Sequence, residues 1–344
     1  MSPIGAAVPG FVVRGDVHTR CRVLEPKSKT LSATERVTTL VELTGLLDEL
    51  SSTTKNELSS MPEVVQGGDN LDISKLPIVA RRWVRLSDVV VVVADLKNST
   101  QLGTGSKAAS TASIYESGTG AVVQIFNKFD ADFMQIQGDG GFAVFWGESR
   151  YERALCAGVT IKTNSLDFSG QIETKWPTKA ETGFKVGIAS GRVLVKRVGT
   201  PGDVNQQEPV WAGKPVNYAA KVAQCANRHE LIVAGSVWDQ IETNDYLTIS
   251  CPCGDGPGSG IWGDFKIEKL PEDDPEREGR ILYSGWCENH GEEYCNAILE
   301  GEKVRSEVKG LRDGMLRSQM ENALRVKARR ERDDRRNRLR GLRR

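Results

Sequence analysis

Histidine is scarce in this chain: only His18, His229 and His290 occur among 344 residues. So few imidazoles leave little material for histidine-assisted nucleophilic catalysis or for a zinc centre with three histidine ligands. We therefore expect any chemistry to depend on carboxylates, amides and basic side chains.

Long apolar runs, a leader segment and a regular cysteine pattern are also missing. The longest purely apolar run, "VVVVVA" at residues 89–94, is far shorter than the about 20 residues that cross a bilayer. The N-terminus shows no basic segment followed by a long apolar core. The seven cysteines are an odd number scattered along the chain, which disfavours a disulfide framework. These patterns predict a cytoplasmic protein without a membrane partner.

The chain as a whole has no excess of positive or negative charge, but its C-terminal segment is strongly basic. Residues 323–344 hold eleven Lys or Arg and three Asp or Glu, a net charge of +8, so this tail is electrostatically separate. No aromatic residue alternates with the cations, which disfavours recognition of single-stranded nucleic acid. We interpret the tail as a solvated helix and do not expect nucleic acid as a partner.

The order of the expected elements indicates an α+β fold. We expect strands at residues 89–94, 132–137 and 141–146, helices at 108–129 and 148–165, a strand pair within 184–199, and then strand, helix and strand to residue 235. This βαββαβ order, with a hairpin in its middle, is typical of a sheet layered by helices.

Four regions are predicted from these patterns. Residues 1–80 form an arm, an amphipathic helix and a linker at 51–74. A "SATE" capping box at residues 32–35 marks the start of this helix. Residues 81–245 form the α+β domain. Residues 246–301 are loop-rich and contain four cysteines. Residues 302–344 form the basic helical tail, with a short apolar seam of Val304, Val308, Leu311 and Met315.

Two aspartates follow strands of the expected sheet. Asp95 ends the polyvaline strand, and Asp139 occupies the glycine-rich turn "QGDGG" of the hairpin. Each can be read as an ordinary turn or capping residue. Alternatively, two carboxylates that converge at one rim without a histidine suit Mg²⁺ or Mn²⁺, completed by substrate phosphates.

Four segments together resemble the class III nucleotide cyclases. They are "VVVVADLKNST", "QGDGGFAVF", "VGIASGRVLVKRVG" and "WAGKPVNYAAKVAQCA", and they occur in the family's order over about residues 85–240. The resemblance implies a ferredoxin-like βαββαβ cyclase domain with a helical and loop-rich C-terminal extension. It also implies a phosphorus–oxygen lyase: the ribose 3′-hydroxyl attacks the α-phosphorus, giving a cyclic nucleotide and diphosphate.

The resemblance assigns roles to particular residues. Asp95 and Asp139 would hold two divalent ions, Mn²⁺ or Mg²⁺, with the backbone carbonyl of Leu96 as a further ligand. Gly138 and Gly140 would let a triphosphate approach the backbone.

The family's sites are shared between two subunits, which implies a homodimer. Asn217 would orient the ribose. Lys221, four residues later on the same helix face, occupies the position of the family's transition-state arginine. Lysine keeps the charge but lacks the bidentate fork of arginine.

The residues that would read the base depart from the purine cyclases. The two positions fall on Gln135 and Val210, where the family has Lys with Asp for adenine or Glu with Cys for guanine. This departure resembles the bacterial pyrimidine cyclases of anti-phage signalling, which implies conversion of UTP to 3′,5′-cyclic UMP and a downstream effector that this messenger activates. UTP is favoured over CTP. A cytidylate cyclase, a purine cyclase with divergent base readers and a catalytically inactive nucleotide-sensing fold are the alternatives.

A second metal site has candidate ligands in the C-terminal region. Cys251, Cys253, Cys287 and Cys295, with His290 between the last two, offer zinc ligands at irregular spacing. Free cysteines in a loop-rich region are the alternative interpretation.

Overall fold

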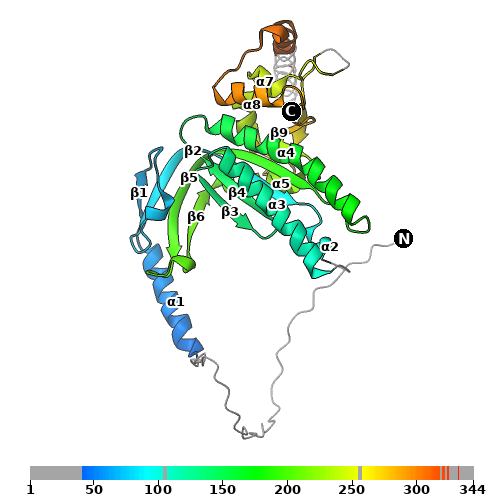
Figure 1. Cartoon of the computed structure of the whole chain (residues 1–344). Coiled ribbons are helices and arrows are strands. Elements are labelled where there is room, and N and C mark those ends of the chain that lie inside the picture. The colour runs from blue at the N-terminus through cyan, green and yellow to red at the C-terminus, as the bar shows by residue number, and fades with distance from the viewer. Residues whose placement is uncertain are drawn as a thin grey trace, which may run out of the picture. The chain divides into compact units, whose positions relative to one another are not determined.

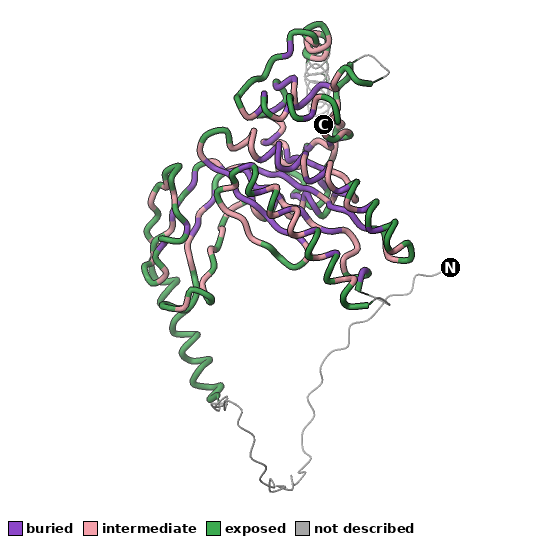
Figure 2. The backbone as a smooth tube through the Cα atoms, in the orientation of Figure 1, coloured by how far each residue is buried: buried purple, intermediate pink, exposed green. Residues whose placement is uncertain are grey.

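A computed structural model describes residues 41–103, 107–254 and 258–317 and the single residues 320, 321, 324 and 332. The chain divides into two compact units, Met1–Met61 and Pro62–Arg344. In the described part of the first unit, helix α1 (Leu43–Leu58) has no buried residue, and Figure 2 colours it as exposed along its length. The predicted capping box at 32–35 lies outside the described residues.

The expected linker at 51–74 contains regular structure instead. It includes the second half of α1, strand β1 (Glu63–Gln66) and the 3₁₀ turn η1 (Ile73–Lys75). Strand β1 pairs in parallel with the start of β2 (Arg82–Leu96). The sequence did not reveal this strand because it has only four residues, mostly exposed, and so shows no apolar alternation.

The second unit is built on one mixed sheet (Figure 1). Its strands run in the order β3-β4-β2-β5-β7-β9-β8, with β1 added to β2 and β6 added to β5. The further strands are β3 (Phe133–Gln137), β4 (Gly140–Phe145), β5 (Phe184–Gly199), β6 (Gln207–Gly213), β7 (Leu231–Val233), β8 (Trp262–Lys266) and β9 (Glu278–Leu282).

The helices of this unit are α2 (Ser99–Leu102), α3 (Ala108–Lys128), α4 (Arg150–Lys175), α5 (Lys214–Cys225), α6 (Gly235–Ile241), α7 (Asp245–Thr248) and α8 (Gly291–Leu299). Strand β2 lies antiparallel between β4 and β5, and β3 pairs antiparallel with β4. The four strands β2 to β5, linked through α3 and α4, thus have the ferredoxin-like order. The predicted α+β fold with a central hairpin is confirmed.

Strand β2 is buried on both faces, as its run of valines predicts. Val90 and Val92 belong to the core under α3 and α4, together with Phe126 and Leu155. Val89 and Val91 belong to the opposite core, which α5 covers. Figure 1 shows α3 and α4 lying side by side across one face of the sheet. The strand end that carries Asp95 is therefore held by packing from both sides.

Residues 184–199 form one continuous strand rather than the expected pair. The amino-terminal part of β5 pairs with β7, and its carboxyl-terminal part pairs with β6. The sequence "SG" at 190–191 suggested a turn, but Ser190 and Gly191 pair with β2. At Gly187 a Cβ atom would overlap the backbone of α5 at Ala219 and Ala223. Glycine here lets the helix lie directly on the strand.

The C-terminal segment is more regular than predicted. Residues 250–301, expected to be loop-rich, contain β8, β9 and α8, and β9 pairs with β7, so these strands extend the main sheet. The tail is not helical from residue 302: the 3₁₀ turn η4 (Ser306–Val308) comes first, and residues 309–317 are helical. Most of the basic tail lies outside the described residues. Among the helices described, none has the length and apolar character needed to cross a membrane.

Candidate active site

The first candidate metal ligand, Asp95, lies at the carboxyl end of β2. Its backbone pairs with that of Lys185 on β5, and the Lys185 ammonium group forms an ion pair with its carboxylate. The side chain of Asp95 is 37% exposed and that of Lys185 is 17% exposed. A partly sheltered carboxylate thus opens toward solvent with one cation already beside it.

The second candidate, Asp139, is brought to the same rim by the turn between β3 and β4. Gly138 adopts φ +63°, a conformation that favours glycine. At Gly140 a Cβ atom would overlap the Ala94 carbonyl oxygen and lie 3.1 Å from the Cα of Asp95. The turn can therefore press against the end of β2 only with glycine at this position. The glycines of "QGDGG" serve this close approach as well as the hairpin itself.

The donor set at this rim fits a hard divalent cation. The Oδ2 atom of Asp139 is buried and has no hydrogen-bond partner among the residues that the structure describes. A buried carboxylate oxygen without a partner is costly unless a cation or a ligand completes it. Asp95 lies against Gly140, the neighbour of Asp139 in the chain, and the backbone of Leu96 belongs to the same strand end. These three residues offer oxygen ligands, which Mg²⁺ and Mn²⁺ prefer.

A cavity of about 200 Å³ lies beside Asp95. Its walls come from β2, from the β3–β4 hairpin and from one face of α5, which contributes Val216, Ala220 and Gln224. Typical ligand pockets have volumes of about 300–1,000 Å³, so this cavity is smaller than they are. Gly140 lines the cavity, but Asn217 and Lys221 do not.

The structure places Asn217 and Lys221 one turn apart on α5. Asn217 is exposed, and its side-chain amide donates only a long hydrogen bond of 3.4 Å to the Gly213 carbonyl. The ammonium group of Lys221 lies 5.8 Å from the ring centre of Tyr218. Both side chains therefore share a side of the helix, as predicted, but within one chain they are not brought to the cavity beside Asp95.

The two candidate base-reading positions lie on β3 and β6. The Gln135 side-chain amide donates to Glu208 on β6 across 3.3 Å. The rings of Phe133 and Trp211, from the same two strands, are 5.1 Å apart. Val210 is 40% exposed and contributes no polar group. The sheet thus curls until β6 faces β3, although the two strands are not neighbours in it.

Two residues at this site were not identified from the sequence. Lys185 could have been suspected as the one charge within the apolar stretch "FKVGIASG". Glu208 carried no signal, because only the curl of the sheet brings it to Gln135.

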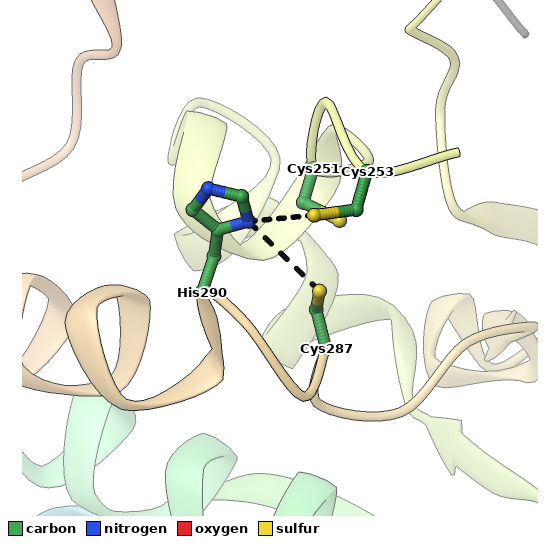
Figure 3. A group of neighbouring side chains, drawn as sticks. All are labelled: Cys251, Cys253, Cys287 and His290. Atoms are coloured by element: carbon green, nitrogen blue, oxygen red, sulfur yellow. Dashed lines mark hydrogen bonds between the residues drawn. The ribbon is translucent and has the colours of Figure 1, made fainter. Parts of the chain in front are cut away.

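A separate cluster of cysteines lies in the C-terminal segment. The ligand atoms of Cys251, Cys253, Cys287 and His290 all lie within 4.8 Å of one another (Figure 3). Hydrogen bonds from His290 and from the backbone amides of His290 and Asn289 lower the pKa of the Cys287 thiol to about 6.

Cys295, the fourth cysteine predicted for this site, is not part of the cluster. Its thiol lies beside that of Cys156 instead, and the hydrogen bond between them lowers the pKa of the Cys295 thiol. The prediction failed at this residue because Cys295 lies inside α8, whereas His290 stands just before the helix and is free to turn toward the loop.

Comparison with known proteins identifies the family. No protein-family model matches the chain. A curated protein named uridylate cyclase, from Micromonospora echinofusca, is 52% identical over 305 residues, which are 88% of this chain and 99% of the relative. A second, with the same name, from Propioniciclava tarda, is 48% identical over 305 residues, covering 88% of this chain and 98% of the relative.

Solved structures of nucleotide cyclases are also similar. The adenylyl cyclase CyaB from P. aeruginosa has a TM-score of 0.43 at 17% identity, covering 51% of this chain and 92% of that one. A class III adenylyl cyclase-like ATP-binding protein from Pseudomonas aeruginosa has a TM-score of 0.46 at 16% identity, covering 79% of this chain and 52% of that one.

The curated relatives define the class as that of the nucleotide cyclases, because they match this chain over nearly their whole length. The chain belongs to the uridylate cyclase family. The resemblance to pyrimidine cyclases seen in the sequence is thereby confirmed.

Proposed function

We propose that this protein converts UTP to 3′,5′-cyclic UMP and diphosphate, with two divalent ions, Mn²⁺ or Mg²⁺, at its active site. The observation that carries the proposal is the identity of about half of all residues with two uridylate cyclases over nearly their full length. The rim formed by Asp95 and Asp139 supports it, since both carboxylates needed to hold the ions are present.

Asp95 and Asp139 would hold the ions, with the Leu96 carbonyl as a further ligand. When bound, the ions would lower the pKa of the attacking ribose hydroxyl and would neutralise the leaving diphosphate. Lys185 forms an ion pair with Asp95, and its ammonium group would be within the same rim to bind a phosphate oxygen of the nucleotide. The open backbone at Gly138, where a Cβ atom would meet nothing within 4 Å, leaves space for the triphosphate.

The remaining groups come from a second copy of the chain in a homodimer. Asn217 orients the ribose, and Lys221 stabilises the negative charge that develops on the α-phosphate. Two observations support a shared site. The cavity beside Asp95, about 200 Å³, is too small for a nucleoside triphosphate. Asn217 and Lys221 also do not line the cavity of their own chain.

The base is read by Gln135 rather than by a purine-specific pair. Glu208 accepts a hydrogen bond from the Gln135 amide nitrogen, which leaves the amide oxygen to accept from a base. Uracil presents an N3–H donor that this oxygen accepts, whereas N3 of cytosine is itself an acceptor. Val210 offers an apolar contact where purine cyclases hydrogen-bond. This arrangement supports UTP as the preferred substrate.

Product analysis tests the reaction. The purified chain is incubated with each of the four nucleoside triphosphates and Mn²⁺, and products are identified by mass spectrometry. We expect cyclic UMP from UTP, and Asp139→Asn should reduce its rate by about 100-fold or more. Asp273→Asn, an exposed carboxylate far along the chain, is the matched control and should keep the wild-type rate. Preference for ATP or GTP would identify a purine cyclase, preference for CTP a cytidylate cyclase, and no product an inactive sensor.

We further propose that cyclic UMP serves as a messenger in defence against phage by activating an effector protein. The support is the resemblance of the sequence to pyrimidine cyclases of such systems. In the native host, infection should raise cyclic UMP and restrict plaque formation. A chromosomal Asp139→Asn allele should abolish both responses, and unrestricted infection of the wild type would contradict the proposal.

A further inference from the structure

The cluster of Cys251, Cys253, Cys287 and His290 has the composition of a structural metal site. Three thiol sulfurs and one imidazole nitrogen are a common ligand set for tetrahedral Zn²⁺. Two of the ligands come from the loop after α7 and two from the turn between β9 and α8, which face each other in Figure 3. We propose that these four residues bind a structural zinc ion.

The distances between ligand atoms fit a tetrahedron around zinc. With Zn–S near 2.3 Å and Zn–N near 2.0 Å, neighbouring ligand atoms are separated by about 3.5–3.8 Å. The Nδ1 atom of His290 lies 3.1 Å from the Cys253 sulfur and 3.9 Å from the Cys287 sulfur. These separations lie on either side of the ideal, and all four ligand atoms lie within 4.8 Å of one another, so the side chains need only small shifts to surround one ion.

Further groups around the cluster are arranged as in metal sites. The Asn289 side-chain amide donates to the Cys253 sulfur at 3.2 Å, and the backbone amides of Asn289 and His290 donate to Cys287. Such N–H···S bonds are typical outer-shell partners of metal-bound thiolates. The His290 ring stacks on Tyr294, with ring centres 5.7 Å apart, and this contact fixes the direction of its Nδ1 atom.

Both loops are anchored close to the cluster. Arg305, which is 2% exposed, donates to the carbonyl oxygens of Ile249 and Ser250 at 3.1 and 3.2 Å. The Gly291 amide donates to the Cys287 carbonyl at 2.7 Å. The ligand atoms are thus presented by restrained backbone on both sides, which lowers the entropy cost of binding an ion.

The zinc would join the segments on either side of the β8–β9 hairpin. It would also fix one wall of a mainly apolar cavity of about 330 Å³, which Cys251 and Cys287 both line. Its role is therefore structural: it holds the C-terminal loops together at a distance along the chain from the residues proposed to act in catalysis.

Metal analysis of the full chain, purified under reducing conditions, tests this inference. We expect close to one zinc ion per chain by mass spectrometry. Removal with a chelator should lower the melting temperature by about 5–10 °C, and readdition of zinc should restore it. Substitution with Co²⁺ should produce the visible bands of tetrahedral thiolate coordination. None of these measurements depends on the cyclase reaction.

Variants separate this site from its alternatives. Loss of an outer-shell partner lowers the affinity for a metal by about 10–100-fold. Cys253→Ser and His290→Ala each remove a direct ligand, so each should lower the affinity for zinc by more than that. Cys295→Ala is the matched control, because it removes a cysteine of the same segment that lies outside the cluster, and it should retain zinc. A reduced wild-type chain that takes up neither Zn²⁺ nor Co²⁺, or equal zinc loss in Cys295→Ala, would overturn the inference.

Discussion

At the scale of single residues, the ion pair between Lys185 and Asp95 is the feature with the most direct consequence for activity. The ammonium group of Lys185 forms an ion pair with the Asp95 carboxylate, which the proposed function assigns to a metal ion as a ligand. Lysine and the ion therefore compete for the same oxygen atoms. We expect the same lysine to contribute to nucleotide binding, because its ammonium group lies at the rim to which the proposed function assigns the triphosphate.

Replacement of this lysine should change metal binding and nucleotide binding in opposite directions. In Lys185→Met, binding of Mn²⁺ without nucleotide should tighten by about fivefold, since a partly exposed ion pair is worth about 1 kcal/mol. The KM for UTP should rise, because a phosphate-binding cation is lost. Mn²⁺ binding followed by electron paramagnetic resonance and steady-state kinetics measure the two effects. Lys266→Met, at the far edge of the sheet, should change neither, and weaker Mn²⁺ binding in Lys185→Met would contradict the competition.

At the scale of elements, the β3–β4 hairpin owes its place at the rim to the missing side chain of Gly140. Nothing in the sequence distinguishes this glycine from Gly138, which serves the turn conformation. Only the register of β4 against β2, with Gly141 opposite Ala94, shows which of the two permits the close contact.

Gly140→Ala should therefore separate the two carboxylates while leaving the fold intact. The new methyl group would overlap the Ala94 carbonyl oxygen, so the turn must move outward, at a cost of about 1–3 kcal/mol in the free energy of unfolding. A displacement of about 1 Å at a catalytic group lowers the rate by about 100-fold. Urea unfolding and cyclase assays measure both effects.

The control for this variant is Gly120→Ala in α3, where a Cβ atom would meet nothing within 4 Å. It should keep full activity and gain about 0.5–1 kcal/mol, because alanine favours a helix. Full activity in Gly140→Ala would show that the hairpin does not need its close contact with β2.

How far the sequence predicts each element depends on how local its determinants are. The polyvaline strand, α3 and the central hairpin follow from periodicity and turn residues. Strand β5 was divided wrongly because Ser190 and Gly191 are a local turn signal that pairing with β2 overrides. The contact between Gln135 and Glu208 was out of reach, since it depends on the curl of the whole sheet.

The C-terminal strands and the cysteine cluster illustrate the same limit. Strands β8 and β9 contain charged residues, and only tertiary pairing identifies them, since β9 pairs with β7 and β8, at the edge of the sheet, pairs with β9. The sequence supplied the cysteines and His290 as candidates, but only the fold shows that His290 joins the cluster and that Cys295 lies beside Cys156 as a free thiol.

At the scale of the whole molecule, the proposed homodimer predicts complementation between two inactive variants. Asp139→Asn removes a metal ligand, and Lys221→Ala removes the group supplied by the partner. Each should be inactive alone. Mixed and re-equilibrated in equal amounts, they should recover about a quarter of the wild-type rate, since half of the dimers then contain one intact site. No recovery, although mixed dimers form, would place both residues in the site of one chain.

The stability of the whole molecule should fall in mild acid because of His229. Burial, then the nearby charges of Arg228 and Lys162, lower the pKa of this imidazole, whose Nδ1 atom lies 2.8 Å from the Ser165 hydroxyl. In the unfolded chain its pKa is about 6.5. Below that pH the unfolded chain binds a proton that the folded chain resists, so the free energy of unfolding falls, and above it the stability is fully present.

Protonation of His229 should change the free energy of unfolding by at most about 1.4 kcal/mol per pH unit. His229→Asn, chosen because the residue has φ +64° and asparagine tolerates that conformation, should unfold with a shallower pH dependence between pH 7 and pH 5. Urea unfolding at several pH values measures the difference. An unchanged slope would assign the acid sensitivity to other groups.

Strand β5 has a further consequence once two chains share their sites. It begins beside Asp95 with Lys185 and ends in the ladder with β6, which carries Val210 and Glu208. In the proposed homodimer Lys185 belongs to one active site, whereas α5, which packs directly on the same strand at Gly187, supplies Asn217 and Lys221 to the other. One strand of 16 residues therefore connects the two sites. Nucleotide binding at the first site should then alter affinity at the second, and the rate should depend on UTP concentration with a Hill coefficient different from unity.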